Sequence, residues 1–145
     1  MKKLSIVCMV MLVILAAGRA FALPGVYRAG SSTMALPIGR CETRTISLDG
    51  TGFISPFVSG GFLLAQSDGG AAVNIPDCQC YDIWDSPPSI VFDPTGYPGG
   101  LFVIVTNLGA GVTPSDNILV CDVTFCGVSW GTATITIDTV PDFDT

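Results

Sequence analysis

The alternation of apolar and polar residues is clearest in the last third of the chain, between residues 101 and 138. Residues 117–125 place apolar side chains at every second position, with polar ones such as Asp122 and Thr124 between them. The apolar positions are Leu119, Cys121, Val123 and Phe125. Because successive side chains of a strand point to opposite faces, this pattern predicts a half-buried strand. Residues 132–138 predict a second such strand, in which threonines alternate with alanine and isoleucine.

Residues 101–106 are apolar at every position but the last, which predicts a strand covered on both sides. We expect these three C-terminal strands to form one sheet of a sandwich. Upstream, short apolar runs between Gly, Pro and Asp turns predict further strands at residues 44–48, 62–67 and 71–75. Residues 52–58 surround Pro56 and predict an edge strand or an irregular crossing. Residues 77–98 are the least regular part of the chain.

The fold class follows from what the pattern lacks. No stretch beyond residue 22 repeats apolar residues with the period of an amphipathic helix over three turns. Frequent Gly and Pro between short β-rich runs are typical of a sandwich or a small barrel. The sequence therefore predicts an all-β fold, a sandwich or a small barrel. We divide the chain into a signal peptide at 1–22, a loosely ordered lead-in at 23–40, a sandwich domain at 41–140 and a tail at 141–145.

The first 22 residues have the three parts of a secretory signal peptide. Lys2 and Lys3 precede an apolar run at residues 4–17, and Ala20-Phe21-Ala22 provides the small residues of a cleavage site. We expect a cleavable signal helix and export to the extracellular space or the periplasm. The apolar run is short for a membrane span, so we expect no membrane attachment after cleavage.

Charge excludes one class of partner. Removal of the signal peptide leaves three arginines and no lysine against twelve acids, so the formal net charge moves from −6 to −9. A chain this acidic repels phosphate backbones, and we expect no nucleic acid as a partner. The sequence contains no histidine, which removes Ser-His-Asp and Cys-His catalysis. Paired carboxylates stay formally open, but no spacing of the acids singles out a pair, and we expect no enzyme activity.

Five cysteines remain after export, where oxidising conditions favour disulfides. Cys121 and Cys126 lie about 16 Å apart along one extended strand, beyond the reach of a disulfide. Cys78 and Cys80 share one face of the chain and are also poor partners. We therefore expect a bridge between the 78/80 pair and the 121/126 pair, with its connectivity and the free thiol left open. The alternative, a redox motif at residues 78–80, is disfavoured because its acidic flanks would raise the pKa of the thiols.

Acidic and aromatic side chains gather in the irregular segment that begins at residue 77. Asp77, Asp82 and Asp85 are candidate calcium ligands, because carboxylate oxygens suit that ion, although no EF-hand spacing is present. Trp84 and Tyr81 are the candidate binding residues, because aromatic rings in loops can stack on sugars or anchor a protein partner. We expect no cofactor other than this possible calcium, and solvated turn aspartates are the simpler interpretation.

Three stretches resemble cohesin modules. The segment Ser115-Asp-Asn-Ile-Leu-Val-Cys-Asp-Val-Thr-Phe125, followed by Gly131-Thr-Ala-Thr-Ile-Thr-Ile137, is similar to the closing strands of that family. Upstream, Ser59-Gly-Gly-Phe62 is similar to its Gly-Gly-Phe strand opening. The resemblance implies an antiparallel β-sandwich of jelly-roll or cohesin-like type with nine strands, a fold shared with some carbohydrate-binding modules. It also implies a non-catalytic role in holding partners outside the cell, since cohesin modules bind dockerin modules through one sheet face.

These observations predict a secreted, non-catalytic β-sandwich module that binds an extracellular protein or a polysaccharide, as in adhesion. The alternative is a structural subunit of a surface or filament assembly, whose exposed edge strands pair with neighbouring copies. An extracellular enzyme that uses carboxylates or the Cys78/Cys80 pair is a third hypothesis.

Overall fold

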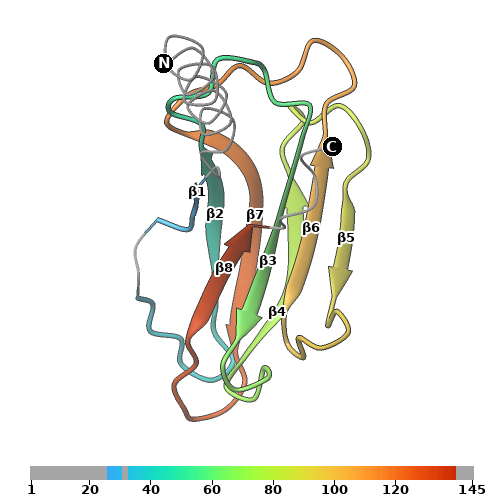
Figure 1. Cartoon of the computed structure of the whole chain (residues 1–145). Coiled ribbons are helices and arrows are strands. Elements are labelled where there is room, and N and C mark those ends of the chain that lie inside the picture. The colour runs from blue at the N-terminus through green and yellow to red at the C-terminus, as the bar shows by residue number, and fades with distance from the viewer. Residues whose placement is uncertain (1–25, 31–32, 140–145) are drawn as a thin grey trace, which may run out of the picture.

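Two four-stranded sheets pack face to face in the computed structural model, which describes residues 26–30 and 33–139 (Figure 1). The strands are β1 (Val26–Arg28), β2 (Cys41–Asp49), β3 (Ser59–Gln66), β4 (Val73–Cys80), β5 (Ser89–Phe92), β6 (Leu101–Thr106), β7 (Ile118–Gly127) and β8 (Ile135–Thr139). The described residues form strands, turns and loops only, so the all-β prediction is confirmed. The predicted signal peptide and the tail at 141–145 lie outside the described residues.

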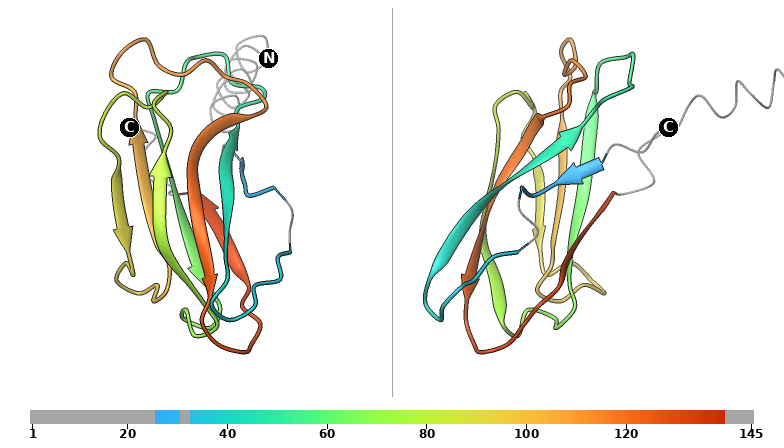
Figure 2. Two further views of the ribbon diagram at one scale, coloured as in Figure 1. Left: turned by 180° about the vertical axis from the view of Figure 1, so that it is seen from behind. Right: turned by 90° about the vertical axis from the view of Figure 1, so that its left-hand side faces the viewer.

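The strand order is β1-β2-β7-β4 in one sheet and β5-β6-β3-β8 in the other, and neighbouring strands are antiparallel throughout. Chain neighbours such as β2 and β3 therefore belong to different layers, and the chain crosses between the layers several times. Figure 2 shows the two layers from behind and from the side. This is the antiparallel sandwich that the sequence predicts. No helix among the described residues is long and apolar enough to cross a membrane.

The hydrophobic core lies between the sheets. From β6, the side chains of Leu101, Val103 and Val105 are fully buried, and β3 adds Phe62 and Leu64 from the same sheet. The opposite sheet supplies the facing side chains Ile46, Leu48, Ile118, Val120, Cys121, Val123 and Phe125. Burying a side chain of this kind contributes roughly 1.5–3 kcal/mol, so the interior of the sandwich holds most of its favourable free energy.

One expectation about the sheets is wrong. The three C-terminal strands do not form one sheet, because β7 belongs to the layer opposite β6 and β8. The connections at residues 107–117 and 128–134 are long enough to carry the chain across the sandwich between layers. Alternation defines the faces of a strand but not the layer to which it belongs.

The inward face of β7 also differs from the predicted one. The pairing with β2 shifts between Ile46 and Ser47, so that Val120 is an extra residue with no partner in β2. A bulge of this kind reverses the alternation. Cys121, Val123 and Phe125 are buried as predicted, but at the start of the strand Val120 is buried and Leu119 is only partly buried.

Two upstream segments are settled by the structure. Of the two alternatives predicted for residues 52–58, the irregular crossing is confirmed and the edge strand is wrong, because these residues contribute only an isolated bridge between Phe57 and Val112. β4 does not end before Pro76 but continues through it to Cys80. A proline is tolerated there because β4 is an edge strand with a register shift at this point, so no ladder hydrogen bond has to be given up.

Candidate functional site

The outer face of the β5-β6-β3-β8 sheet is apolar. Directly opposed residues of antiparallel strands point to the same side, and the register places Val91, Phe102 and Leu63 in one row across three strands. Ile104 extends this surface along β6, and Asp138 ends the row on β8. Val91 is 43% exposed, and the other three apolar side chains are partly exposed. We call Leu63, Val91, Phe102 and Ile104 the apolar face.

A hollow of about 340 Å³ lies on the apolar face. Phe102 and Leu63 line it from the sheet, Tyr97 and Pro94 from the β5–β6 loop, and Asp138 from β8. The hollow therefore offers an apolar surface with a single carboxylate beside it.

The β5–β6 loop that forms the rim of this hollow has a fixed shape. The backbone N–H of Gly99 donates to the carboxylate of Asp93 at 2.7 Å, and the N–H of Tyr97 donates to the carbonyl of Pro94 at 2.8 Å. Gly99 has φ +70°, and a Cβ atom there would lie 2.5 Å from the Cα of Gly70. Only glycine allows the backbones of these two turns to come this close. The contact between the turns therefore holds Tyr97 at the rim of the hollow.

The outer face of the other sheet has the opposite chemistry. Thr43 and Thr124 share a hydrogen bond of 3.0 Å, and Thr45 donates to Asp122 at 2.6 Å. The hydroxyl of Tyr81 donates to the same carboxylate at 3.1 Å. These polar side chains are satisfied by one another. The two outer faces therefore differ, and the apolar one is the candidate binding surface.

The apolar face was not predicted from the sequence, although residues 101–106 contain the pattern that indicates it. Residues 101–106 are apolar on both sides, a pattern that predicts a strand covered on both sides. Within the described residues, β6 is covered on one side only, and Phe102 and Ile104 remain partly exposed on the other. The same pattern was therefore a sign of an uncovered surface.

The prediction that Trp84 is a binding residue is wrong. Its side chain is only 4% exposed, and its indole N–H donates to the carbonyl of Leu119 at 3.1 Å. The chain turns after β4, where the N–H of Trp84 donates to the carbonyl of Tyr81, and this turn directs the ring into the core. Tyr81 is half-buried on the polar face, where it holds Asp122.

The three candidate calcium ligands are not brought together. Asp85 accepts hydrogen bonds from the N–H groups of Leu108 and Gly109, so its carboxylate shapes a loop. Asp77 accepts from the side chain of Gln79 on the same strand, and Asp82 lies exposed after it. Across residues 26–30 and 33–139, no three acids lie close enough to share an ion. Calcium binding stays a prediction of the sequence that this geometry does not support.

Two disulfides hold β7 to its neighbours. Cys80 is bonded to Cys121, which links the end of β4 to β7, and Cys41 is bonded to Cys126, which links the start of β2 to β7. The first is one of the pairings that the sequence left open between residues 78/80 and 121/126. The second was not anticipated, because only the strand register places Cys41 opposite Cys126.

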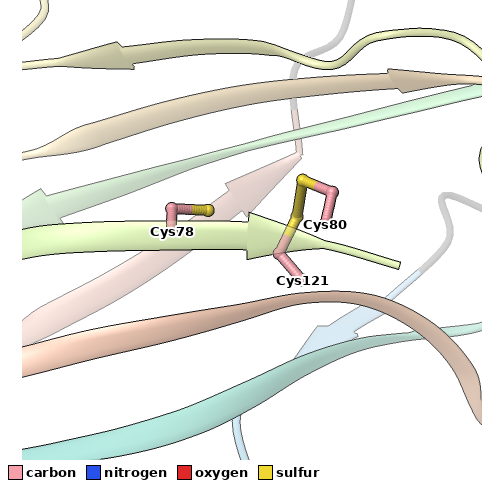
Figure 3. A group of neighbouring side chains, drawn as sticks. All are labelled: Cys78, Cys80 and Cys121. Atoms are coloured by element: carbon pink, nitrogen blue, oxygen red, sulfur yellow. A yellow bond between two sulfur atoms is a disulfide. The ribbon is translucent and has the colours of Figure 1, made fainter. Parts of the chain in front are cut away.

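Cys78 is not part of a disulfide, contrary to its inclusion among the expected bridging residues. Among the described cysteines it is the free thiol, buried on the inward side of β4 and opposite Val123 rather than a cysteine. Figure 3 shows its sulfur directed along the strand toward the Cys80–Cys121 bond, and the three sulfur atoms lie within 4.8 Å of one another. Burial raises the pKa of the Cys78 thiol to about 12, with a smaller contribution from Asp77. A protonated thiol is a poor nucleophile, which disfavours the redox hypothesis.

Alkaline pH is expected to destabilise the fold through one buried group, Cys78, and one partly buried group, Tyr27. Burial raises the pKa of Cys78 from 9.0 to about 12 and that of Tyr27 from 10.0 to about 12. The folded state therefore keeps protons that the unfolded chain releases, so their stabilising effect is complete below pH 9 and is lost as pH rises toward 12. Chemical unfolding at pH 8 and pH 10.5 measures the loss. The Tyr27→Phe and Cys78→Ala variants should each show a smaller decline, and an unchanged decline in both would contradict this assignment.

Comparison with known proteins shows which solved structures have a similar fold. No protein-family model matches the chain, and no curated protein matches it. A cohesin module of a family 33 glycoside hydrolase from Clostridium perfringens is similar, with a TM-score of 0.56 at 10% identity over 80% of this chain and 94% of that one. The second type II cohesin module of the ScaA adaptor scaffoldin from Acetivibrio cellulolyticus gives 0.55 at 12% identity, over 86% and 76%.

A third similar structure was solved with a partner. It is the sixth cohesin of scaffoldin B from Acetivibrio cellulolyticus, in complex with a Cel5 dockerin, with a TM-score of 0.51 at 12% identity over 70% of this chain and 73% of that one. Identities this low carry information about the fold alone. The chain has a cohesin-like β-sandwich fold, and the resemblance seen in the sequence is confirmed at that level.

Proposed function

We propose that this chain is an exported, non-catalytic module that binds a protein partner on its apolar face. The observation that carries the proposal is the contrast between the two outer faces. The polar face satisfies its own hydrogen bonds, whereas the apolar face leaves Val91 and Phe102 partly in water. A contiguous apolar surface on a sheet is typical of an interaction site. A cohesin of similar fold was solved in complex with a dockerin, which supports a protein as the partner.

The shape of the apolar face favours a protein over a small molecule. A sheet surface with one open hollow suits a partner that spreads over the strands and inserts a single anchoring side chain. The hollow between Phe102 and Tyr97 would take that anchor. Asp138 at its edge would pair with a basic or hydrogen-bond-donating group of the partner.

Export is part of the same proposal. Two disulfides suit an oxidising compartment, which agrees with the signal peptide expected at residues 1–22. The extracellular space or the periplasm both meet this condition.

Edge-to-edge assembly into a surface or filament structure is less well supported. β4 is an edge strand, but Pro76 and the register shift between Asn74 and Asp77 interrupt its row of hydrogen-bonding groups. The other edge strands are short, with three residues in β1, four in β5 and five in β8. Short, interrupted edges are features that discourage pairing with another chain.

The apolar face can be tested with one disruptive variant and one matched control. Phe102→Glu puts a carboxylate in the centre of the apolar face, and Thr43→Glu puts one on the outer face of the other sheet, each on an interior strand. Wild type and Thr43→Glu immobilised on resin should capture the same protein from the culture supernatant of the producing organism. Phe102→Glu should bind that purified protein at least tenfold more weakly, because the charge would lose its hydration in the contact.

Equal binding of the purified partner by all three proteins would contradict the proposal. Loss of binding by Thr43→Glu alone would move the site to the polar face. Circular dichroism of each variant establishes that the sandwich is intact, and a monodisperse monomer at high concentration would speak against the filament alternative.

A further inference from the structure

A second surface, formed by the β7–β8 turn, carries an aromatic side chain that is almost fully exposed beside the described residues. The indole of Trp130 is 90% exposed, against 45% for Tyr97 at the rim of the apolar face. A tryptophan side chain offers 150–250 Å² of surface to bury, so its exposure forgoes a large stabilisation. A polar residue at this position in the turn would leave the core unchanged.

The turn holds Trp130 outward on a fixed support. On its N-terminal side, the hydroxyl of Ser129 donates to the carbonyl of Ala71 at 2.6 Å, and the N–H of Val128 donates to the carbonyl of Ala72 at 2.9 Å. The residue before Trp130 is therefore anchored to the turn that precedes β4. The ring is presented by an ordered turn, which lowers the entropy that a ligand would have to remove.

A hollow of about 450 Å³ lies beside the turn, and Trp130 itself is not among the residues that line it. Ser129 and Gly131, its two chain neighbours, both line this hollow. Thr132 and Thr134 line it from the approach to β8, and Met34 and Leu36 line it from the lead-in segment. Its lining contains hydroxyl groups and aliphatic surface but no charged side chain, and it shares no residue with the hollow on the apolar face.

We infer that this end of the sandwich binds a neutral glycan. A pyranose ring has an apolar face that stacks on an exposed indole, and hydroxyl groups at its edge that pair with other hydroxyls and with backbone groups. Trp130 supplies the stacking surface, and the threonine hydroxyls at 132 and 134 supply polar partners for the next sugar unit. An uncharged lining gives no partner for carboxylate or sulfate groups, so the ligand class is neutral rather than acidic. This site is independent of the protein-binding proposal.

The inference can be tested with soluble oligosaccharides and the two tryptophans. Cellohexaose, xylohexaose and mannohexaose serve as neutral probes, and oligogalacturonate serves as the acidic probe. Because Trp84 is buried and Trp130 is exposed, the emission of Trp130 should shift to shorter wavelength when a glycan covers it. We expect at least one neutral probe to bind, with little or no response to oligogalacturonate.

Variants then locate the site. Trp130→Ala should weaken binding of the responding glycan at least tenfold by calorimetry, Trp130→Phe should restore part of it, and Phe102→Glu should leave it unchanged. Thr132→Val, which keeps the side-chain shape, should weaken it by a few-fold. Failure of all three neutral probes, equal binding by Trp130→Ala, stronger binding of oligogalacturonate, or occupancy of the hollow by a peptide instead would each overturn the inference.

Discussion

Replacing Cys41 and Cys126 together by alanine is expected to lower the free energy of unfolding by about 4 kcal/mol. This disulfide joins residues 85 apart in the chain, and the Cys80–Cys121 bond inside that span shortens the effective loop. Each bond constrains the unfolded chain far more than the folded one, where strand pairing already places the partners opposite each other. Because β7 lies between β2 and β4, the bond ties the centre of its sheet to one neighbour.

Guanidinium unfolding followed by the fluorescence of buried Trp84 measures this loss. The Cys78→Ala variant is the matched control, because it removes a sulfur from the same sheet and leaves both disulfides in place. If the double variant lost no more than the control, β7 would not depend on this bond.

Phe62→Ala is expected to cost about 3–5 kcal/mol, the range for removing a fully buried aromatic side chain. Phe62 is 0% exposed and lies on β3, between β6 and β8, so no edge of the sheet can relax into the cavity. Its ring centroid is 5.4 Å from that of Tyr27, and this contact joins β1 to the core of the opposite sheet. A domain with a total stability of roughly 5–15 kcal/mol would be close to unfolding after this change.

Phe102→Ala is the control for the core prediction. Phe102 lies on the neighbouring strand but points outward, where its side chain is partly exposed. We expect it to cost less than about 1.5 kcal/mol in the same unfolding experiment. Equal losses for the two variants would mean that the apolar face is covered within the monomer, which the binding proposal does not allow.

The sequence was sufficient for the strands and the fold class because side-chain alternation is a local property. Alternation located the strands around residues 44–48, 101–106 and 117–125, and the resemblance to cohesin modules indicated the cohesin-like architecture. The layer to which each strand belongs depends on long-range pairing, which is why β7 was placed in the wrong sheet. The bulge at Val120 was hidden because its neighbour Leu119 is also apolar, so the shift in alternation left no mark in the pattern.

The candidate sites were harder to predict for the same reason. Trp84 lies among polar residues in the sequence, and only the turn after β4 reveals that its ring enters the core. Trp130 has a similar sequence context but stays in solvent. The apolar face consists of residues from three strands that are far apart in the chain, such as Leu63 and Phe102, and register alone brings them together. Cys41 and Cys126 are likewise far apart in the chain, and only the strand register brings them together.

The most direct test of the central claim is a methyl NMR titration of the chain with the protein that it captures. Methyl groups report on both outer faces, since Leu63, Val91 and Ile104 lie on the apolar one and Thr43, Thr45 and Thr124 on the polar one. The proposal predicts that the resonances of the first group shift as the complex forms while those of the second stay in place. Shifts confined to the threonine methyls would contradict it.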